Sequence, residues 1–514
     1  MSIRGSLTSQ IGVEDMRNIT VKSIKKSFGG KVALSGVSLS FSDGDRLALV
    51  GENGAGKSTL LKILCGEIVP DSGEFFGLEN GCAYIAQDFS GELEETPHQF
   101  LQRKVPKLNK AIRLLEESGF AVGKNQERLQ NVRCGVLSGG EQKKLELVAG
   151  IASNSAFLAI DEPENHLDYQ SIEWLIGVLQ SFRGGVVFVS HDQYLVDQLA
   201  STILELEDGA VTVYSMKYGE YLAEKERQVA GDERQWMMEG KTITRLRKTV
   251  EMMKNRARRS SDTAATYQQT KRRLHEMQES HGNRPTIEVD KPKVKLGSVD
   301  QKKGKIIASI QNLGFSYEKA RVFRAATADL RFGEKVVIFG SNGSGKSTLI
   351  NLLVGNLAPQ NGSVAIGQNV RWQYMTQDHL AGIDASRSAF DVFQATLSLP
   401  EARCRAYLAK YSIRADSALR PLRDLSGGQQ ARFKLALTFA QDPEFLILDE
   451  PTNHVDPATW DAIVEAVDGY SGTVLAVTHD RSFIDAIAQK LWIIESGTIK
   501  VELGNLSDYL EKKG

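Results

Sequence analysis

Two glycine-rich segments carry the clearest chemical signal in the chain, GENGAGKST from Gly51 and GSNGSGKST from Gly340. Both fit the pattern G-x-x-x-x-G-K-[ST], a loop whose backbone N–H groups surround phosphate oxygens at the start of a helix. The lysine neutralises the β- and γ-phosphates, and the hydroxyl after it can bind Mg²⁺. We therefore predict two nucleotide sites. The loop residues assigned to them are Gly51, Asn53, Gly54, Gly56, Lys57, Ser58 and Thr59, and Gly340, Asn342, Gly343, Gly345, Lys346, Ser347 and Thr348.

Acidic residues and a histidine follow each loop in the same order. Asp161 and Asp449 end apolar segments, where a carboxylate can hold Mg²⁺, and each is followed by a glutamate, Glu162 or Glu450. A carboxylate beside a γ-phosphate can orient or deprotonate the attacking water. The catalytic residues predicted on this basis are Glu162, Glu450, His191 and His479, the histidines as neutral imidazoles that can contact the γ-phosphate.

The elements that must position these residues occur twice. The first aspartates, Asp161 and Asp449, are 288 residues apart, and so are the two histidines. Within each repeat a short apolar run precedes the glycine loop and a helix-forming run follows it. Further apolar runs without polar alternation are typical of buried parallel strands. We therefore expect an α/β fold, present in two copies.

Composition fits a cytosolic multidomain protein. The chain has 514 residues, 41% of them hydrophobic and 25% charged, with a net charge of −1. Its four cysteines include no C-x-x-C pair, which argues against a disulfide framework or a cysteine-held metal site. Neither a signal peptide nor a segment of 18 uninterrupted apolar residues is present, so we expect a cytoplasmic location.

The segment between the repeats differs from both. Residues 219–284 contain no proline, and Ile243, Leu246, Val250 and Met253 recur at helical spacing, as do Tyr267, Leu274 and Met277. Two antiparallel helices joined near residues 258–262 would bury these stripes against each other. Residues 241–280 hold eleven Lys or Arg and four Asp or Glu, so a neutral total conceals a basic hairpin. Such a surface suits RNA, although the charge alone is explained somewhat better by a merely solvated helical linker.

The order of motifs, P-loop, then Gln87 or Gln377, then LSGGE or LSGGQ, then Asp-Glu, then His, resembles that of the ATP-binding cassette ATPases. This resemblance implies that two cassettes close head to tail over two ATP molecules, as an intramolecular sandwich within a monomer. Each phosphate loop would face the LSGG segment of the other cassette. The resemblance adds Ser138, Gly140, Ser426 and Gly428 to the ATP-binding residues, and Phe28 and Tyr317 as adenine-stacking rings. It implies a Mg²⁺ set of Ser58, Gln87 and Asp161, and of Ser347, Gln377 and Asp449, with Gln87 and Gln377 also contacting ATP.

Two fused cassettes, a basic linker and the sequences ENHLD and TNHVD after the Asp-Glu-Pro motifs resemble the F subfamily of this family. Members act on ribosomes as translation factors or as antibiotic-resistance ribosomal protection proteins, and the linker approaches rRNA and peptidyl-tRNA near the exit site. The resemblance places Arg256, Arg258 and Arg259 at RNA contacts. Glu164 stands where the subfamily has threonine, present as Thr452 in the second copy, so equal activity of the two sites is open.

We therefore predict an N-terminal segment (1–17), a first ATP-binding cassette domain (18–222), a helical hairpin linker (223–304) and a second cassette domain (305–514). The predicted fold class is α/β, two P-loop cassettes in tandem joined by an α-helical hairpin. The predicted function is ATP hydrolysis coupled to the ribosome, with no transmembrane partner. The main alternative is the ATPase subunit of a transporter that docks on a separate membrane protein. Both ATP and GTP, and both translation-factor and drug-protection roles, stay compatible with the motifs.

Overall fold

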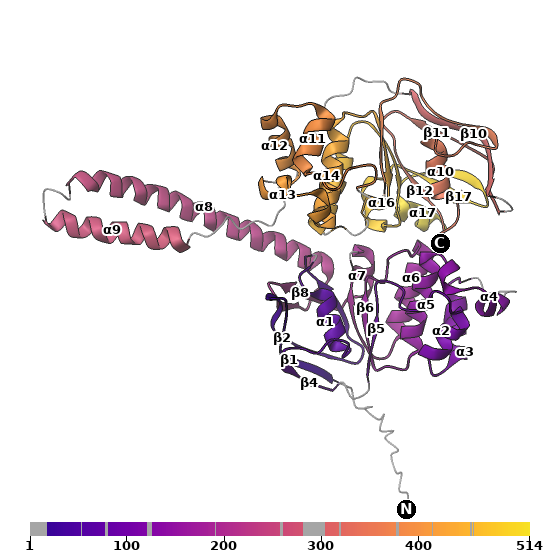
Figure 1. Cartoon of the computed structure of the whole chain (residues 1–514), viewed down its shortest axis with the longest axis horizontal. Coiled ribbons are helices and arrows are strands. Elements are labelled where there is room, and N and C mark those ends of the chain that lie inside the picture. The colour runs from indigo at the N-terminus through magenta and orange to yellow at the C-terminus, as the bar shows by residue number, and fades with distance from the viewer. Residues whose placement is uncertain are drawn as a thin grey trace, which may run out of the picture. The chain divides into compact units, whose positions relative to one another are not determined.

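The structure, a computed structural model, describes residues 18–52, 54–77, 81–120, 126–190, 192–256, 261–280, 304–317, 320–376, 380–413, 415–452, 455 and 457–513. The chain divides into two compact units: residues 1–218 with 291–514, and residues 219–290. The first unit holds two copies of one α/β arrangement, which we call the first cassette (elements before Tyr218) and the second cassette (elements after residue 303) (Figure 1). The second unit is helical. The predicted fold class is thereby confirmed.

Each cassette contains one six-stranded, mostly parallel sheet. In the first cassette the order is β5-β6-β7-β3-β8-β9, in which only β9 is antiparallel to its neighbour. The second cassette repeats it as β14-β15-β16-β12-β17-β18. These strands are β3 (Arg46–Val50), β5 (Cys82–Ile85), β6 (Phe157–Asp161), β7 (Gly185–Val189), β8 (Thr202–Glu207), β9 (Ala210–Tyr214), β12 (Lys335–Phe339), β14 (Trp372–Met375), β15 (Phe445–Asp449), β16 (Thr473–Val477), β17 (Lys490–Glu495) and β18 (Thr498–Leu503).

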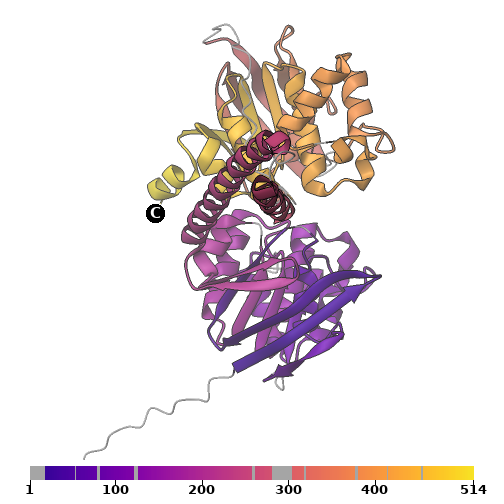
Figure 2. The same cartoon turned by 90° about the vertical axis from the view of Figure 1, so that its left-hand side faces the viewer.

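A three-stranded antiparallel sheet completes each cassette, with the order β2-β1-β4 or β11-β10-β13. Its strands are β1 (Asn18–Phe28), β2 (Lys31–Ser42), β4 (Ser72–Phe76), β10 (Ile306–Tyr317), β11 (Ala320–Arg331) and β13 (Asn361–Ile366). Figure 2 shows the indigo strands of this sheet beside the parallel sheet of the first cassette. Both β1 and β10 end at the aromatic residue that is predicted to stack on adenine.

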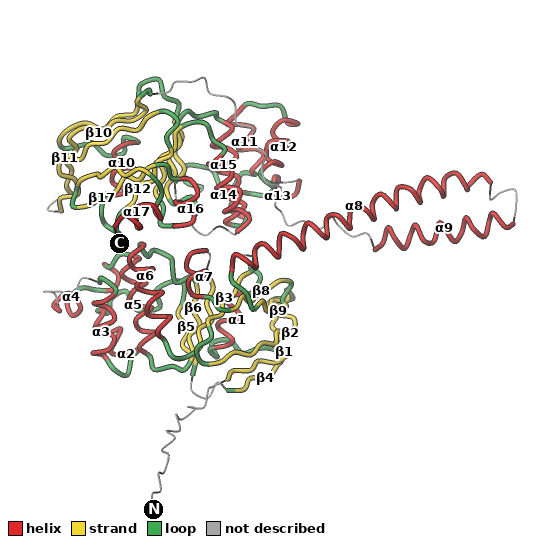
Figure 3. The backbone as a smooth tube through the Cα atoms, turned by 180° about the vertical axis from the view of Figure 1, so that it is seen from behind, coloured by secondary structure: helices red, strands yellow, loops and turns green. Residues whose placement is uncertain are grey.

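Helices flank the sheets and form a separate group in each cassette. In Figure 3, α2, α3 and α5 gather at one end of the first cassette, while β1, β2 and β4 lie at the other. The helices of the first cassette are α1 (Lys57–Leu64), α2 (Pro97–Lys104), α3 (Leu108–Glu117), α4 (Gln126–Asn131), α5 (Gly139–Ala152), α6 (Tyr169–Ser181) and α7 (Gln193–Leu199), with a 3-10 turn at Cys134–Val136. Those of the second are α10 (Lys346–Leu353), α11 (Ala389–Leu397), α12 (Glu401–Lys410), α13 (Ala415–Leu419), α14 (Gly427–Ala440), α15 (Pro457–Asp468), α16 (Arg481–Ile487) and α17 (Leu506–Lys513), with a 3-10 turn at Leu422–Asp424.

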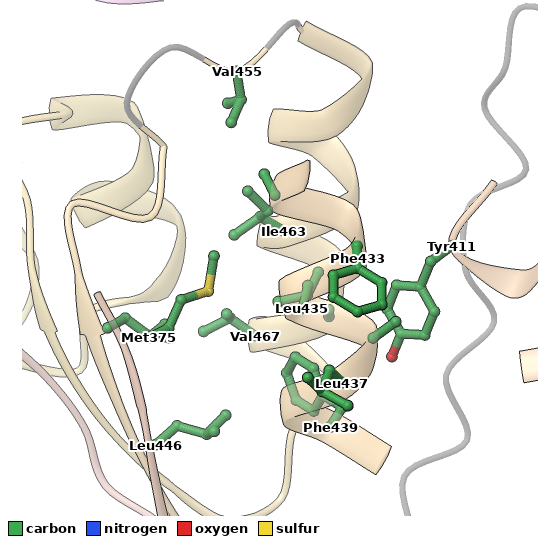
Figure 4. Packing of buried hydrophobic residues seen from close by; sticks show 14 of the residues in the cluster. Met375, Tyr411, Phe433, Leu435, Leu437, Phe439, Leu446, Val455, Ile463 and Val467 are labelled. Carbon is green, nitrogen blue, oxygen red and sulfur yellow. The ribbon is translucent and has the colours of Figure 1, made fainter. Parts of the chain in front are cut away.

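The helix that follows each LSGG motif is buried around most of its circumference, and its apolar residues pack into the core of its cassette. Figure 4 shows Phe433, Leu435 and Phe439 of α14 among the side chains of the second cassette's core. The start of this helix is fixed as well, because Ser426 and Gln429 form a reciprocal capping box. Ser138 and Glu141 do the same for α5. The core thus holds the LSGG segments at defined helix N-termini.

The second unit contains two helices, α8 (Tyr218–Arg256) and α9 (Ser261–Ser280), which run antiparallel (Figure 1). The predicted apolar stripes are their less exposed positions. Leu274 is buried, and Ile243, Leu246, Val250, Met253, Tyr267 and Met277 are half-buried. By contrast, the charged side chains described between residues 241 and 276 are exposed. The predicted helical hairpin is therefore present, and its basic residues face solvent.

Candidate functional site

Both phosphate loops lie at the carboxyl end of a central parallel strand, β3 or β12, and lead into α1 or α10. Gly56 and Gly345 cap these helices with φ of 106° and 108°, a left-handed conformation that glycine adopts without strain. At Gly51 a Cβ would lie 2.4 Å from the carbonyl oxygen of Leu206. Glycine is therefore required at Gly56 and Gly345 by the backbone conformation, and at Gly51 by the close approach of β8.

The loop lysines occupy equivalent positions. Lys57 donates from Nζ to the carbonyl oxygens of Gly51 (2.7 Å) and Glu52 (2.9 Å). Lys346 donates to those of Gly340 (2.8 Å) and Ser341 (3.1 Å). Burial lowers the pKa of Lys346. Each ammonium group is thus held inside its loop, where a phosphate chain would meet it.

Each aspartate at the end of β6 or β15 accepts a hydrogen bond from a tyrosine. The hydroxyl of Tyr84 donates to Oδ2 of Asp161 (3.1 Å), and the hydroxyl of Tyr374 donates to Oδ2 of Asp449 (3.0 Å). Burial raises the pKa of Asp449. A divalent cation would offset this cost because it stabilises the ionised carboxylate. Carboxylate and hydroxyl oxygens are the ligands Mg²⁺ prefers, so these positions fit that ion.

Glu162 is oriented by two amide groups. Its Oε2 accepts hydrogen bonds from Nε2 of Gln87 and Nδ2 of Asn165, each 2.7 Å long. Its backbone φ is 44°, and Glu450 in the second cassette has a φ of 48°. A left-handed conformation is unfavourable for a residue with a Cβ. The glutamate after the strand-end aspartate therefore has the same strained backbone conformation in both cassettes.

Glu450 lies against the predicted histidine. Nε2 of His479 is 3.6 Å from Oε1 of Glu450, and the backbone N–H of His479 donates to Oε2 (3.3 Å). Burial, and next the charge of Asp449, raise the pKa of Glu450 to about 8. Burial, and next the charge of Lys346, lower the pKa of His479 to about 3. The imidazole is therefore neutral at pH 7, as expected from the sequence.

Two cavities surround these groups, and each contains residues of both cassettes. The first, of about 570 Å³, is lined by Phe28, Lys31, Val32, Ala33, Gly54, Gly56, Lys57, Ser58, Thr59, Gln87, Asp161, Glu162 and Val189 together with Gly427 of the second cassette. The second, of about 650 Å³, brings Ser138, Gly140, Glu164 and Asp192 of the first cassette to Tyr317, Asn342, Gly343, Gly345, Lys346, Ser347, Thr348, Asp449, Glu450, Thr452, His479 and Asp480. Both volumes are of the size that holds a small ligand.

Direct bonds join the cassettes at the second cavity. The backbone N–H of Asn342 donates to Oδ2 of Asp168 (3.1 Å), and its side-chain amide donates to the carbonyl oxygen of His166 (2.9 Å). A Cβ at Gly140 would lie 2.6 Å from that same carbonyl oxygen. The LSGG segment of the first cassette therefore sits close against the phosphate loop of the second.

The far end of each cavity is aromatic. Phe28 and Tyr317 are half exposed, at 49% and 48%, so each ring keeps a face open for stacking. The two ends differ three residues later, where Lys31 lines the first cavity and Ala320 lines the second. The two cavities thus have equivalent arrangements of residues, and they differ beside the aromatic residue that is predicted to stack on adenine.

Some predicted residues are not placed in these cavities. Asn53, His191, Gln377, Arg258 and Arg259 lie outside the described residues, and so does the side chain of Arg256. Among the described loop and LSGG residues, Gly51, Gly340, Ser426 and Gly428 are not part of the cavity linings, and Gly427 is the LSGG residue that lines the first.

Reasoning from the sequence missed several residues that touch the predicted ones. Tyr84 and Tyr374 are 290 residues apart, the same separation as Gln87 and Gln377, so the repeat itself held the signal. Lys143 donates to the carbonyl oxygens of Gln87 (3.1 Å) and Asp161 (3.1 Å), yet alanine occupies its place in the second repeat. Comparison of the two repeats therefore could not have predicted the hydrogen bonds of Lys143.

Two phosphate loops, each sharing a cavity with the LSGG segment of the other repeat, define a twin ATP-binding cassette protein. The family model described as ABC transporter matches residues 34–165 and 323–453. The chain is 30% identical to the energy-dependent translational throttle protein EttA of Mycobacterium tuberculosis, over 91% of this chain and 89% of that protein. It is 29% identical to ABC transporter F family member 5 of Arabidopsis thaliana, over 96% of this chain and 77% of that protein.

The chain belongs to the F subfamily of ATP-binding cassette proteins. Among solved structures it resembles the archaeal ribosome recycling factor aABCE1 with a TM-score of 0.64 at 19% identity, over 95% of this chain and 92% of that one. That similarity concerns the fold. In the part of the chain that the structure describes, none of the helices combines the length and the apolar character needed to cross a membrane.

Proposed function

We propose that this protein binds two ATP molecules between its cassettes, hydrolyses them, and uses that cycle to act on the ribosome. The observation that carries the first part is the second cavity, in which Ser138 and Gly140 of one cassette face Lys346 and Glu450 of the other. A nucleotide there would touch both cassettes. ATP would hold them together, and loss of its γ-phosphate would weaken that link.

The roles follow from the groups present. Lys57 and Lys346 neutralise the phosphates, and the backbone N–H groups of the glycine loops and of the LSGG helix starts donate to them. Glu162 and Glu450 accept a proton from the attacking water, and His479, with His191 as its counterpart, contacts the γ-phosphate as a neutral imidazole.

Mg²⁺ is the metal that these sites fit. Ser58, Gln87 and Asp161, and Ser347, Gln377 and Asp449, would hold it. Its charge would offset that of the phosphate oxygens. A pKa of about 8 keeps the carboxyl of Glu450 protonated at pH 7. The use of Glu450 as a base therefore depends on the positive charge that would enter with the nucleotide's metal.

The two sites are unequal in this proposal. Burial raises the pKa of Asp480 in the second cassette, and hydrogen bonds from the backbone N–H of Phe483 and the indole N–H of Trp460 act in the opposite direction. In the first cassette the equivalent of Thr452 is Glu164, whose charge adds to burial and to the charge of Asp480 in raising the pKa of Asp192. The first cassette thus has a carboxylate where the second has a hydroxyl, so its half of the interface is electrostatically less favourable.

The ribosomal part of the proposal rests on the hairpin. The described basic residues between positions 241 and 273 are all exposed, namely Lys241, Arg245, Arg247, Lys248, Lys254, Lys271, Arg272 and Arg273. Arg272 forms an ion pair with Glu276 (3.0 Å), a residue of the same helix. Exposed lysines and arginines along a long hairpin of two α-helices suit the phosphates of RNA. The name of EttA, a translational throttle protein with 89% of its length matched, supports a role in translation.

The proposed partners are rRNA and peptidyl-tRNA near the exit site, contacted by the hairpin end that includes Arg256, Arg258 and Arg259. The protein would act in the cytoplasm as a monomer, as a translation factor or as a ribosomal protection protein. Co-sedimentation with ribosomes in ATP and in ADP tests the proposal. Equal absence from the ribosome pellet in both would contradict it, and flotation with membranes would favour the transporter alternative.

Drug susceptibility separates the two ribosomal roles. Cells that express the protein would resist drugs of the peptidyl-transferase centre or exit tunnel if it protects ribosomes. Altered growth or stalling without resistance would support the translation-factor role.

A further inference from the structure

We propose that Cys65 and Cys82 form a reversible disulfide that regulates the first nucleotide site. Their sulfur atoms are 2.7 Å apart, and the thiol of Cys65 donates to the sulfur of Cys82. A disulfide bond is about 2.05 Å long, so bonding requires an approach of only about 0.7 Å. Both residues are free cysteines and both are partly exposed, which leaves them open to a small oxidant. The residues are 17 apart in sequence, so the sequence pattern did not reveal the pair.

The positions of the two residues connect the pair to the nucleotide site. Cys65 is the C-cap of α1, the helix that begins with Lys57 and Ser58 of the phosphate loop. Cys82 is the first residue of β5, which carries Tyr84, the donor to Asp161, and leads to Gln87. A bond between them would join the end of the phosphate-loop helix to the strand that supports the predicted metal ligands.

Only the first cassette has this pair. The position equivalent to Cys65 is Val354, the C-cap of α10, and the position equivalent to Cys82 is Trp372, the first residue of β14. The other two cysteines, Cys134 and Cys404, are both buried. The second site therefore serves as a control within the same molecule.

The reaction needs a two-electron oxidant of the peroxide class. The Cys82 thiol releases its proton, its thiolate attacks one oxygen of hydrogen peroxide, and the O–O bond breaks to give sulfenic acid and hydroxide. The released proton converts this hydroxide to water. The sulfur of Cys65 then displaces hydroxide from that sulfur, and its proton converts the hydroxide to a second water. Two thiols and one peroxide thus give one disulfide and two waters. A hydrogen bond with Cys82, and next burial, raise the pKa of Cys65, so Cys65 keeps its proton and is the donor in the observed contact.

The direct test is mass spectrometry of the purified full chain after treatment with hydrogen peroxide. The proposal predicts a loss of about 2 Da, two hydrogen atoms, reversed by dithiothreitol, with a Cys65–Cys82 peptide in the non-reducing digest. C65S and C82S should each abolish that peptide, whereas C134S and C404S should leave it unchanged. Oxidation that yields only sulfinic acids, or no loss of mass, would overturn the proposal. This readout does not depend on the ATPase assignment.

The regulatory part is tested by nucleotide affinity in the same oxidised and reduced samples. In the K346A background, which removes the phosphate-loop lysine of the second site, a fluorescent ATP analogue should change its affinity for the first site by roughly threefold or more on oxidation. The C65S/C82S double variant should show no change with peroxide. Equal affinities in the oxidised and reduced protein, with the disulfide formed, would refute regulation.

Discussion

Asn342, in the phosphate loop of the second cassette, donates its side-chain amide to the backbone carbonyl of His166 in the first cassette (2.9 Å). Its backbone N–H donates to the carboxylate of Asp168 (3.1 Å). A phosphate loop is thus bonded directly to the segment that follows Glu162 of the opposite cassette. A structural change at the second nucleotide site can therefore reach the segment after Glu162 through these two hydrogen bonds.

Replacing Asn342 with alanine should weaken this connection. The variant loses one hydrogen bond between the cassettes, typically about 0.5–1.5 kcal/mol, which corresponds to roughly a 2- to 12-fold change in an equilibrium constant. We expect the KM for ATP at the second site to rise by a factor in that range, measured in the E162Q background. N351A, which removes an exposed amide on α10, is the matched control, since its bonds lie within the second cassette. An unchanged KM in N342A would show that the bond is not used in closure.

The two predicted bases can be separated by substitution. Gln is nearly the same size as Glu but accepts no proton, so the E162Q/E450Q double variant should bind ATP and lose at least about 100-fold in turnover. Each single variant should keep the turnover of the other site. Phosphate release and ATP binding measured on the same samples would reveal both effects. Undiminished turnover in the double variant would remove both residues from the mechanism.

The environment of Asp192 predicts that the stability of the folded protein depends on pH. It lies buried at the N-cap of α7, where its carboxylate accepts from the backbone N–H of Leu195 (3.0 Å). Burial, and next the charges of Asp480 and Glu164, raise the pKa of Asp192 to about 7, whereas backbone N–H groups of Leu195 and Tyr194 act in the opposite direction. Between pH of about 4 and 7, the carboxyl of Asp192 therefore keeps its proton in the folded protein, whereas the same carboxyl is ionised in the unfolded chain. Stability due to this group is present at low pH and is lost as the pH rises through about 7.

The D192N variant should not show the fall in stability that Asp192 causes as the pH rises. Asparagine caps helices as well as aspartate and carries no charge. D192N should match the parent near pH 4 and be more stable at pH 8, by roughly 4 kcal/mol at most. Thermal unfolding across this range is the measurement. E164T, which removes one of the two neighbouring charges, should give a smaller gain of the same sign. Equal melting temperatures of D192N and the parent at pH 8 would contradict the assignment.

The fold and most of the site followed from the repeated sequence. The strand ends, the loop lysines and the Asp-Glu pairs each occur twice at nearly constant separation, and buried parallel strands bring their carboxyl ends to one edge. The hairpin was predictable for a different reason, because helical periodicity is a local property and Leu274 and its neighbours follow it. Both the repeated motif spacing and the helical periodicity can be detected in the sequence without knowledge of the tertiary structure.

Contacts between distant segments did not follow from the sequence. The bond from Asn342 to His166 joins residues 176 apart and depends on how two cassettes meet, which no local pattern encodes. Lys143 reaches Gln87 from a different element of the first cassette and has no counterpart in the second repeat. The pairing of Cys65 with Cys82 depends on the end of α1 meeting the start of β5, so two scattered cysteines gave no sign of it.

The central claim is that ATP-bound cassettes hold the basic hairpin on the ribosome. Its most direct test is salt-dependent co-sedimentation of the E162Q/E450Q protein with ribosomes in ATP and in ADP. We predict retention in ATP and release in ADP. Adding R245Q, K248Q and K271Q on the hairpin should weaken binding and lower the salt slope, by up to roughly 0.7–0.9 for each phosphate that is no longer neutralised. The control substitutions K107Q, K110Q and R113Q, at surface residues of the first cassette, should change neither. Ribosome binding that is equal in ATP and ADP, and equal in the hairpin and control variants, would contradict the account.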